Sequence, residues 1–181
     1  TDQLEQFYVT NNSLDCIEVN EEYIAWATEN WTYENGNIDE GVEFSVVCVP
    51  EGYTYVPDDN FEQALVDLGY DDIVDSFVLT ENISSVTNLY VGEKEISDLT
   101  GIEGFTSLTE LQCTDNDLTV LDMSANTALT SLYCYGNQLT SLDVSLNTAL
   151  TYLACDYNQL TSLDVSGATA LTSLTCGSNQ L

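Results

Sequence analysis

Apolar residues in the second half of the chain recur at intervals of 21 residues. Each unit follows the frame Leu-x-x-Leu-x-Cys-x-x-Asn-x-Leu-x-x-Leu-Asp-Val/Met-Ser, starting at Leu108 and again every 21 residues. One earlier unit starts near Val86, 22 residues before Leu108, and carries Lys94 in place of the Asn. A period of this length predicts a solenoid, in which each coil buries its apolar edge only against its neighbours. The cysteine column is Cys113, Cys134, Cys155 and Cys176, and the asparagine column is Asn116, Asn137, Asn158 and Asn179.

The alternation in Leu-x-Cys predicts one short strand per coil, with Leu and Cys pointing inward. Stacked coils would then form a parallel sheet with strands about 4.8 Å apart. We expect each column Asn to turn inward and to bond backbone amides and carbonyls at the corner. Those groups have no partner in a strand ladder, and we expect the bonds to lie within the same coil and the next one.

A helix is predicted over residues 58–68, just before the first coil. Asp58 or Asp59 supplies an N-cap, acidic residues occupy the first turn, and Gly69 ends the helix. Phe61, Leu65 and Leu68 share one face at helical spacing. Such a helix would cover the apolar end of the solenoid, as a terminal cap must.

The repeat frame resembles the leucine-rich-repeat family, and within it the secreted or cell-surface bacterial kind with Cys in the third apolar column and a Leu-Asp-Val-Ser segment. The resemblance covers residues 86–181, and residues 51–85 are similar to the helical N-terminal cap of that group. It implies an α/β solenoid with short parallel strands, located outside the cytosol, which binds a ligand or builds an extracellular structure rather than catalysing a reaction.

The N-terminal residues carry a second trace of the frame. Leu4, Phe7, Asn12, Leu14 and Ile17 fit its apolar and Asn positions, although short apolar patterns also match by chance. We therefore interpret residues 1–19 as the last coil of a preceding stack and residues 20–50 as its β-rich C-terminal cap. Because the final unit stops in mid-coil, we expect the chain to be a segment of a longer protein with tandem stacks.

The six cysteines fall into two classes. The four in the column are expected to be small buried hydrophobic residues. Disulfides between coils need a torsion that in-register neighbours rarely have, and a metal-binding thiolate ladder lacks a second type of ligand. Cys16 and Cys48 break the period and lie in the C-terminal cap, where the resembling family is often cross-linked. We predict a disulfide between them, which indicates an oxidising compartment.

Charge excludes several classes of function. The chain has 31 acidic residues, one Lys and neither Arg nor His, for a net charge of −30. Nucleic-acid binding and docking on anionic lipid both need basic residues, and the lack of His removes imidazole catalysis. There is no apolar run long enough for membrane insertion. No cofactor is predicted. Weak Ca²⁺ binding by the acidic surface is an alternative to simple adaptation to a salty exterior.

A candidate ligand face lies on the outward side of the predicted strands. Tyr133, Tyr135 and Tyr152 should cluster on adjacent coils beside Asp156. Exposed tyrosines with polar neighbours suit contact with protein or carbohydrate, although tyrosine also favours strands for its own sake. A second outward column contains Asp122, Asp143 and Asp164, which either bond their own turns or share a cation.

These observations predict a non-enzymatic extracellular protein. Its function is either structural and adhesive, as part of a surface protein or filament that can self-associate end to end, or recognition of a glycan or protein by the tyrosine-bearing strand face.

Overall fold

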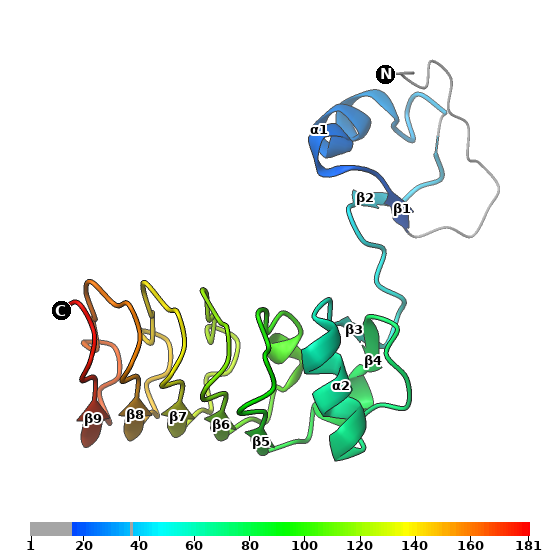
Figure 1. Ribbon diagram of the computed structural model, residues 1–181. Coiled ribbons are helices and arrows are strands. Elements are labelled where there is room, and N and C mark those ends of the chain that lie inside the picture. The colour runs from blue at the N-terminus through cyan, green and yellow to red at the C-terminus, as the bar shows by residue number, and fades with distance from the viewer. Residues whose placement is uncertain (1–15, 37) are drawn as a thin grey trace. The chain divides into compact units, whose positions relative to one another are not determined.

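The computed structural model describes residues 16–36 and 38–181. The chain forms two compact units, Thr1–Pro50 and Glu51–Leu181. The second unit contains the repeats, and it consists of a cap followed by stacked coils (Figure 1). The trace of the repeat frame between Leu4 and Leu14 lies outside the described residues, so that the assignment of residues 1–19 to an earlier stack stays a prediction.

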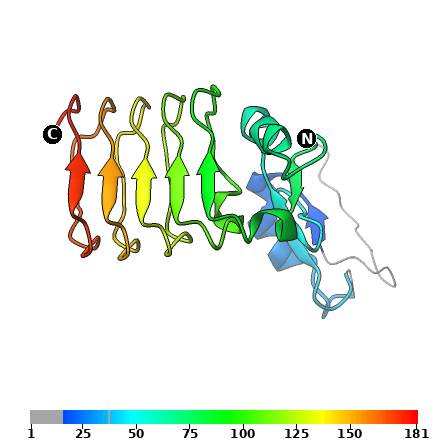
Figure 2. The ribbon, with the colours of Figure 1, turned by 90° about the horizontal axis from the view of Figure 1, so that it is seen from below.

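Five short strands of the second unit form one parallel sheet, each strand coming from a different coil (Figure 2). The register pairs Leu89 with Leu111, Leu111 with Leu132, and so on to Leu174, so that consecutive coils stack without a shift. The predicted solenoid with parallel strands is confirmed. The strands are β5 (Asn88–Tyr90), β6 (Glu110–Gln112), β7 (Ser131–Tyr133), β8 (Tyr152–Ala154) and β9 (Ser173–Thr175).

The core is made of the repeated apolar columns. Leu111, Leu132 and Leu153 are fully buried, and so are Cys113, Cys134 and Cys155 two residues later in each coil. Each buried leucine contributes roughly 1.5–3 kcal/mol relative to an exposed one. Because each coil has only three strand residues, stability comes from these columns rather than from long strand ladders. A short 3₁₀ helix, η1 (Ile102–Gly104), adds Ile102 to the same core.

The asparagine column ties neighbouring coils together through their backbones. The side-chain amide of Asn137 donates to the carbonyls of Cys134 (3.1 Å) and Cys113 (2.9 Å), and its Oδ1 accepts from the amide of Leu118 (3.1 Å). The bonds outside the residue's own coil therefore run to the preceding coil, and our expectation that they run to the next coil was wrong. The reason is that the next coil brings its own asparagine: Asn158 donates to the Cys134 carbonyl at 3.0 Å.

A second buried asparagine column was not predicted. Asn126 and Asn147 lie at the opposite corner and are almost completely buried. Asn147 donates to the carbonyls of Met123 and Asn126, both at 3.0 Å, and Asn126 bonds the preceding coil in the same way. In the next coil the equivalent position is Ala168, which is buried but has no side-chain donor.

The N-terminal cap of the solenoid contains helix α2 (Asp59–Leu68), close to the predicted 58–68. Asp58 is the N-cap, and its Oδ1 accepts from the amides of Asn60 (3.0 Å) and Phe61 (2.9 Å). Gly69 ends the helix in the left-handed region, with φ of 79°, a conformation that glycine adopts without strain. The expected apolar face was wrong at Leu68, which is 44% exposed, because Ala64 rather than Leu68 packs beside Phe61 and Leu65.

Two more elements complete this cap. Strand β3 (Tyr53–Tyr55) pairs antiparallel with β4 (Phe77–Leu79), and the short helix α3 (Thr80–Ile83) follows directly. Glu62 of α2 is fully buried, and its two carboxylate oxygens accept from the amides of Asp75 (3.1 Å) and Ser76 (2.9 Å). These bonds fasten the loop after α2 to the helix.

The N-terminal unit contains a helix where we expected mostly strand. Helix α1 (Glu21–Asn30) lies between strand β1 (Cys16–Glu18) and strand β2 (Glu43–Ser45), which pair in parallel. The two acidic residues of its first turn favour the positive end of the helix dipole. Its aromatic residue Trp26 contacts Trp31, which in turn contacts Phe44 of β2. These aromatic contacts connect helix α1 to strand β2.

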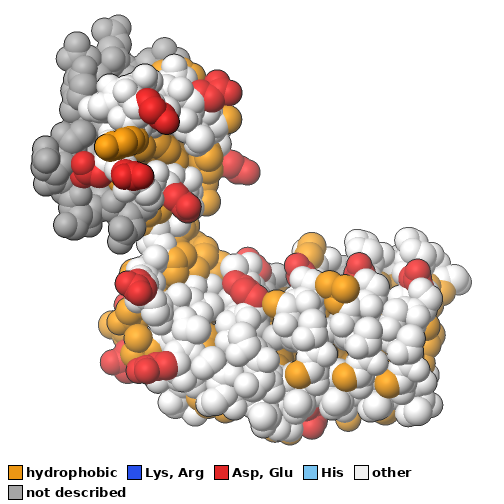
Figure 3. Space-filling model, turned by 180° about the vertical axis from the view of Figure 1, so that it is seen from behind, with side chains coloured by type: hydrophobic (Ala, Val, Ile, Leu, Met, Phe, Trp, Pro, Cys, Tyr) orange, Lys and Arg blue, Asp and Glu red, His pale blue; other side chains and the backbone are white. Residues whose placement is uncertain are grey.

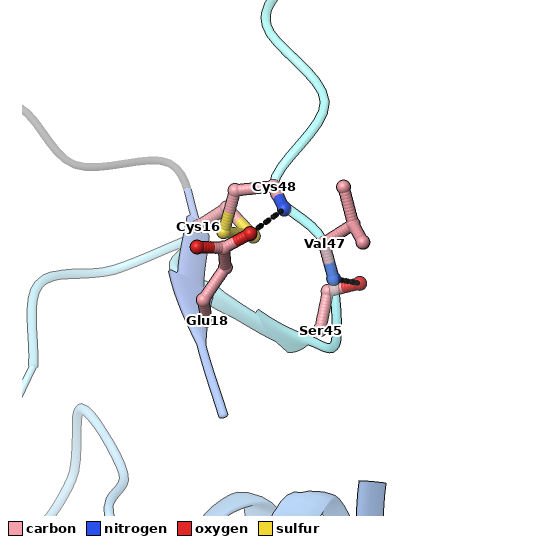
Figure 4. Close-up of a disulfide and its surroundings, with 5 residues drawn as sticks. All are labelled: Cys16, Glu18, Ser45, Val47 and Cys48. Atoms are coloured by element: carbon pink, nitrogen blue, oxygen red, sulfur yellow. Dashed lines mark hydrogen bonds between the residues drawn. A yellow bond between two sulfur atoms is a disulfide. The ribbon is translucent and has the colours of Figure 1, made fainter. Parts of the chain in front are cut away.

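A disulfide closes this unit. Cys16 of β1 is bonded to Cys48, with their Cα atoms 5.7 Å apart (Figure 4). The amide of Cys48 also donates to the Glu18 carboxylate at 3.3 Å. Since the bridge closes a loop with a sequence separation of 32, the loop-entropy model gives a stabilisation of about 4 kcal/mol.

Candidate functional site

The outward side chains of strands β5–β9 form a continuous surface, which we call the strand face. The central residue of each strand points inward, so the first and third residues point outward. Because the core takes up the inner side, this is the side of the sheet that can meet a partner. The strand face consists of Asn88, Tyr90, Glu110, Gln112, Ser131, Tyr133, Tyr152, Ala154, Ser173 and Thr175.

Tyr133 and Tyr152 come together at the centre of this face. Their ring centroids are 4.9 Å apart, with an interplanar angle of 33°. They are diagonal neighbours, because Tyr133 pairs with Ala154 and Tyr152 pairs with Ser131 in the register. Both small partners leave room for the rings, and Ala154 is buried between larger neighbours. The pair therefore offers a broad, preformed aromatic surface with two hydroxyl groups.

Glu110 lies beside the tyrosine pair and is held in place by neutral amides. Its carboxylate accepts from Asn88 Nδ2 of the preceding strand and from Gln112 Nε2 of its own strand, each at 3.1 Å. Asn88 Nδ2 also contacts the hydroxyl oxygen of Tyr90 at 3.2 Å, and Tyr90 is 49% exposed. Neither amide neutralises the charge of Glu110, so a fixed carboxylate remains on the strand face.

This arrangement affects the titration of Tyr133. Partial burial raises the pKa of its hydroxyl, and the negative charge of Glu110 raises it further. A raised pKa keeps the phenol protonated and able to donate a hydrogen bond. The same electrostatic effect indicates that a cation at this position would be stabilised.

The other two residues of the predicted ligand face lie just beyond the strands. Tyr135 follows β7 and is 37% exposed. Asp156 follows β8, and its Oδ1 accepts from the amide of Gly177 in the next coil at 2.8 Å. Asp156 therefore supports the stack as well as facing outward. Glu110 and Gln112 were not part of the predicted site. Tyr90, which aligns with Gln112 and Tyr133 in the register, was not predicted either.

The aspartate column lies on a different part of the coil. Asp122, Asp143 and Asp164 are aligned by parallel bridges, and each carboxylate accepts from the backbone amide of the Ser two residues later at 2.8–2.9 Å. Hydrogen bonds from that serine lower the pKa of each carboxyl. Acidic side chains recur along the solenoid on the face shown in Figure 3, where no Lys or Arg is visible. Among the described residues no group of three or more His, Cys, Asp or Glu side chains could hold a metal ion.

The buried thiols of the cysteine column are unreactive. Burial raises the pKa of Cys113 and of Cys155 to about 12, and it raises that of Cys134 well above its ordinary value. The thiolate is the form that attacks substrates and binds metals, so these protonated side chains act as packing groups. Cys176 is partly exposed.

Comparison with known proteins identifies the repeat type. No family model matches the chain. Internalin J of Listeria monocytogenes serotype 4b (strain F2365) is 45% identical over 73 residues. A solved functional domain of InlJ from Listeria monocytogenes, which includes a cysteine ladder, is 41% identical with a TM-score of 0.65, and the match covers 75% of this chain. In this chain, too, cysteines of successive coils form a column, and Cys113, Cys134 and Cys155 in it are buried. The solenoid has the leucine-rich-repeat fold and is similar to that of a bacterial internalin.

Two further structures share the leucine-rich-repeat fold at lower identity. An internalin, InlF, from Listeria monocytogenes is 23% identical with a TM-score of 0.58, covering 69% of this chain and 44% of its own. The leucine-rich-repeat protein LIC12759 of Leptospira interrogans is 21% identical with a TM-score of 0.52, covering 54% of this chain and 27% of its own. This chain spans 30% of the solved InlJ chain and 8% of internalin J. Helices long and apolar enough to cross a membrane are absent from residues 16–36 and 38–181.

Proposed function

We propose that this internalin-like leucine-rich-repeat segment is a non-enzymatic recognition module of an extracellular adhesive protein, and that it binds a protein partner through the strand face. The observation that carries the proposal is the Tyr133–Tyr152 pair at the centre of that face. Tyrosine pairs provide a large, rigid contact area and hydroxyl groups at low conformational cost, which is typical of binding surfaces.

The chemistry of the described residues supports binding rather than catalysis. The buried thiols are protonated, and the carboxylates of the aspartate column are occupied by their own turns. A rigid sheet with fixed aromatic side chains loses little entropy when it binds a partner. The proposal needs no resident cofactor, and Ca²⁺ would act only as a weak counterion to the acidic surface.

The extracellular location rests on two observations. The Cys16–Cys48 disulfide is of the kind that persists in oxidising compartments. The high negative charge suits a protein that must stay dispersed in a salty medium. Both observations support secretion or display on the cell surface.

A paired array experiment tests the proposal. The purified chain is applied to a protein array and to a glycan array, alongside a double variant, Tyr133→Ser with Tyr152→Ser, and a control, Tyr157→Ser. Tyr157 is a suitable control because it is 68% exposed but lies outside the strands. We expect protein signals that the double variant loses and the control keeps.

Other outcomes would replace the proposal. Binding only to glycans, lost in the same double variant, would assign the strand face to carbohydrate. Filaments seen by electron microscopy of the native material, together with array signals that the double variant leaves unchanged, would favour end-to-end self-association and a structural function.

A further inference from the structure

The charge of the strand face restricts the partners that fit it. Glu110 is the acidic residue of the strand face, and it pairs with Ser131, which in turn pairs with Tyr152. Glu110 and Tyr152 are thus two strands apart, or about 10 Å between backbones, with the small Ser131 between them. Tyr133 lies two residues along the same strand from Ser131.

Among the described residues, no basic side chain neutralises this carboxylate. The chain contains no Arg and no His, and its one lysine, Lys94, is bonded to Asp67 at 3.2 Å. The groups that do contact Glu110, Asn88 and Gln112, are neutral amides that fix its direction. A fixed, uncompensated carboxylate beside two half-buried tyrosine rings is complementary to a planar cation, because a guanidinium stacks on aromatic rings and pairs with a carboxylate through two N–H groups.

We infer that the protein partner inserts an arginine side chain between Glu110 and the Tyr133–Tyr152 pair, with its guanidinium stacked on the rings and bonded to the carboxylate. This inference rests on the proposed function, since it names the chemistry of the partner at the same face. Arginine fits better than lysine, because an ammonium group can satisfy the carboxylate but cannot stack as a plane. The net charge of −30 would also steer a basic partner toward the chain.

The test is a selection followed by matched variants. A phage-displayed library of random short peptides is selected against the immobilised chain, and the enriched peptides are synthesised. We expect them to share one arginine, whose replacement by the neutral isostere citrulline lowers affinity about tenfold. Glu110→Gln in the chain should lower affinity about tenfold as well, and Tyr133→Leu about fivefold, because it keeps apolar area but removes the aromatic ring.

Asp143→Asn is the matched control, because it removes one negative charge from the same solenoid at a distance from the strand face. It should leave affinity within about twofold of the wild type. Melting curves establish that each variant is folded. Glu110→Gln keeps the size of the side chain and one of the two bonds, since its single side-chain oxygen can accept from Asn88 or from Gln112 whereas its NH2 group cannot accept.

The outcomes separate the inference from the proposed function. Enriched peptides without a cation, whose binding is lost in Tyr133→Ser with Tyr152→Ser, would overturn the arginine inference and leave the strand face as the binding surface. Equal losses of peptide affinity in Glu110→Gln and Asp143→Asn would also overturn the arginine inference. They would show that the peptides are attracted by the overall negative charge of the chain rather than by Glu110. Arginine peptides that bind equally well to the tyrosine double variant would count against both proposals.

Discussion

The asparagine column makes a quantitative prediction about coupling between coils. In Asn137→Ala, the amide of Leu118 loses its side-chain acceptor, which costs about 1–3 kcal/mol for a buried group. The carbonyls of Cys113 and Cys134 each lose one of two side-chain donors, because Asn116 still donates to the first and Asn158 to the second. At about 0.5–1 kcal/mol for each of these losses, the variant should be destabilised by about 3 kcal/mol.

The double variant Asn137→Ala with Asn158→Ala should lose more free energy of unfolding than the two single variants lose together. Together the two changes remove both side-chain donors from the Cys134 carbonyl, which neither change does alone. We expect a coupling energy of about 1–2 kcal/mol. The pair Asn116 and Asn158 shares no carbonyl acceptor, so that its double variant should be additive within about 0.5 kcal/mol.

Urea denaturation followed by circular dichroism measures these free energies of unfolding. Gln138→Ala is the control for the single change, since this exposed neighbour bonds only the Asp117 side chain and the Leu118 carbonyl, the latter through its backbone. It should cost less than about 0.5 kcal/mol. Additive energies for Asn137 and Asn158, or equal coupling in both pairs, would refute the idea that shared carbonyls link adjacent coils.

Three further predictions concern the cap, the second column and the thiols. Asp58→Asn should destabilise by about 2–3 kcal/mol while Asp59→Asn changes little, because Asp58 Oδ2 accepts from the amides of Ser97 and Asp98 and from the Ser97 hydroxyl. Burial alone would raise the pKa of Asp58, but these hydrogen bonds hold it below its ordinary value of 3.8. The stabilisation by Asp58 is therefore present above pH 3.8 and is lost as the pH falls through the lowered pKa. If the stability of Asp58→Asn fell as steeply in acid as that of the wild type, this reasoning would be contradicted. Ala168→Asn should raise stability by about 1 kcal/mol by extending the Asn126–Asn147 column, and a lower melting temperature than the wild type would argue against that column's contribution. Thiol labelling of the native, unreduced chain at mildly alkaline pH should modify Cys176 first and spare Cys113, Cys134 and Cys155. The unfolded, unreduced chain should give four reactive thiols, because Cys16 and Cys48 are bonded to each other. A count of six reactive thiols would refute this disulfide.

The regular part of the fold could be predicted from the sequence because the same buried positions recur in each coil. Leu111 and Cys113 recur every 21 residues, and a column that must stay buried in every coil cannot shift without exposing all its members. Helix α2 was predictable for a local reason, since Asp58 and Gly69 are strong start and stop residues.

The missed features depend on contacts that no local pattern reveals. The burial of Asn126 and Asn147 could not be predicted, because asparagine is common in exposed turns and the burial follows only from the stacking of coils. Helix α1 is supported by aromatic contacts of Trp31 with Phe44, from a strand that follows it in sequence. In the candidate site, the proximity of Tyr133 and Tyr152 followed from the register, whereas the position of Glu110 depends on side-chain bonds with Asn88 and Gln112.

The central claim is that the strand face is the binding surface. Hydroxyl-radical footprinting of the chain, free and bound to a protein partner found on the array, tests it most directly, because mass spectrometry reports the oxidation of each tyrosine separately. The account predicts that the partner protects Tyr133 and Tyr152 and leaves Tyr157 unprotected. Protection of Tyr157 with unchanged oxidation of Tyr133 and Tyr152 would contradict it.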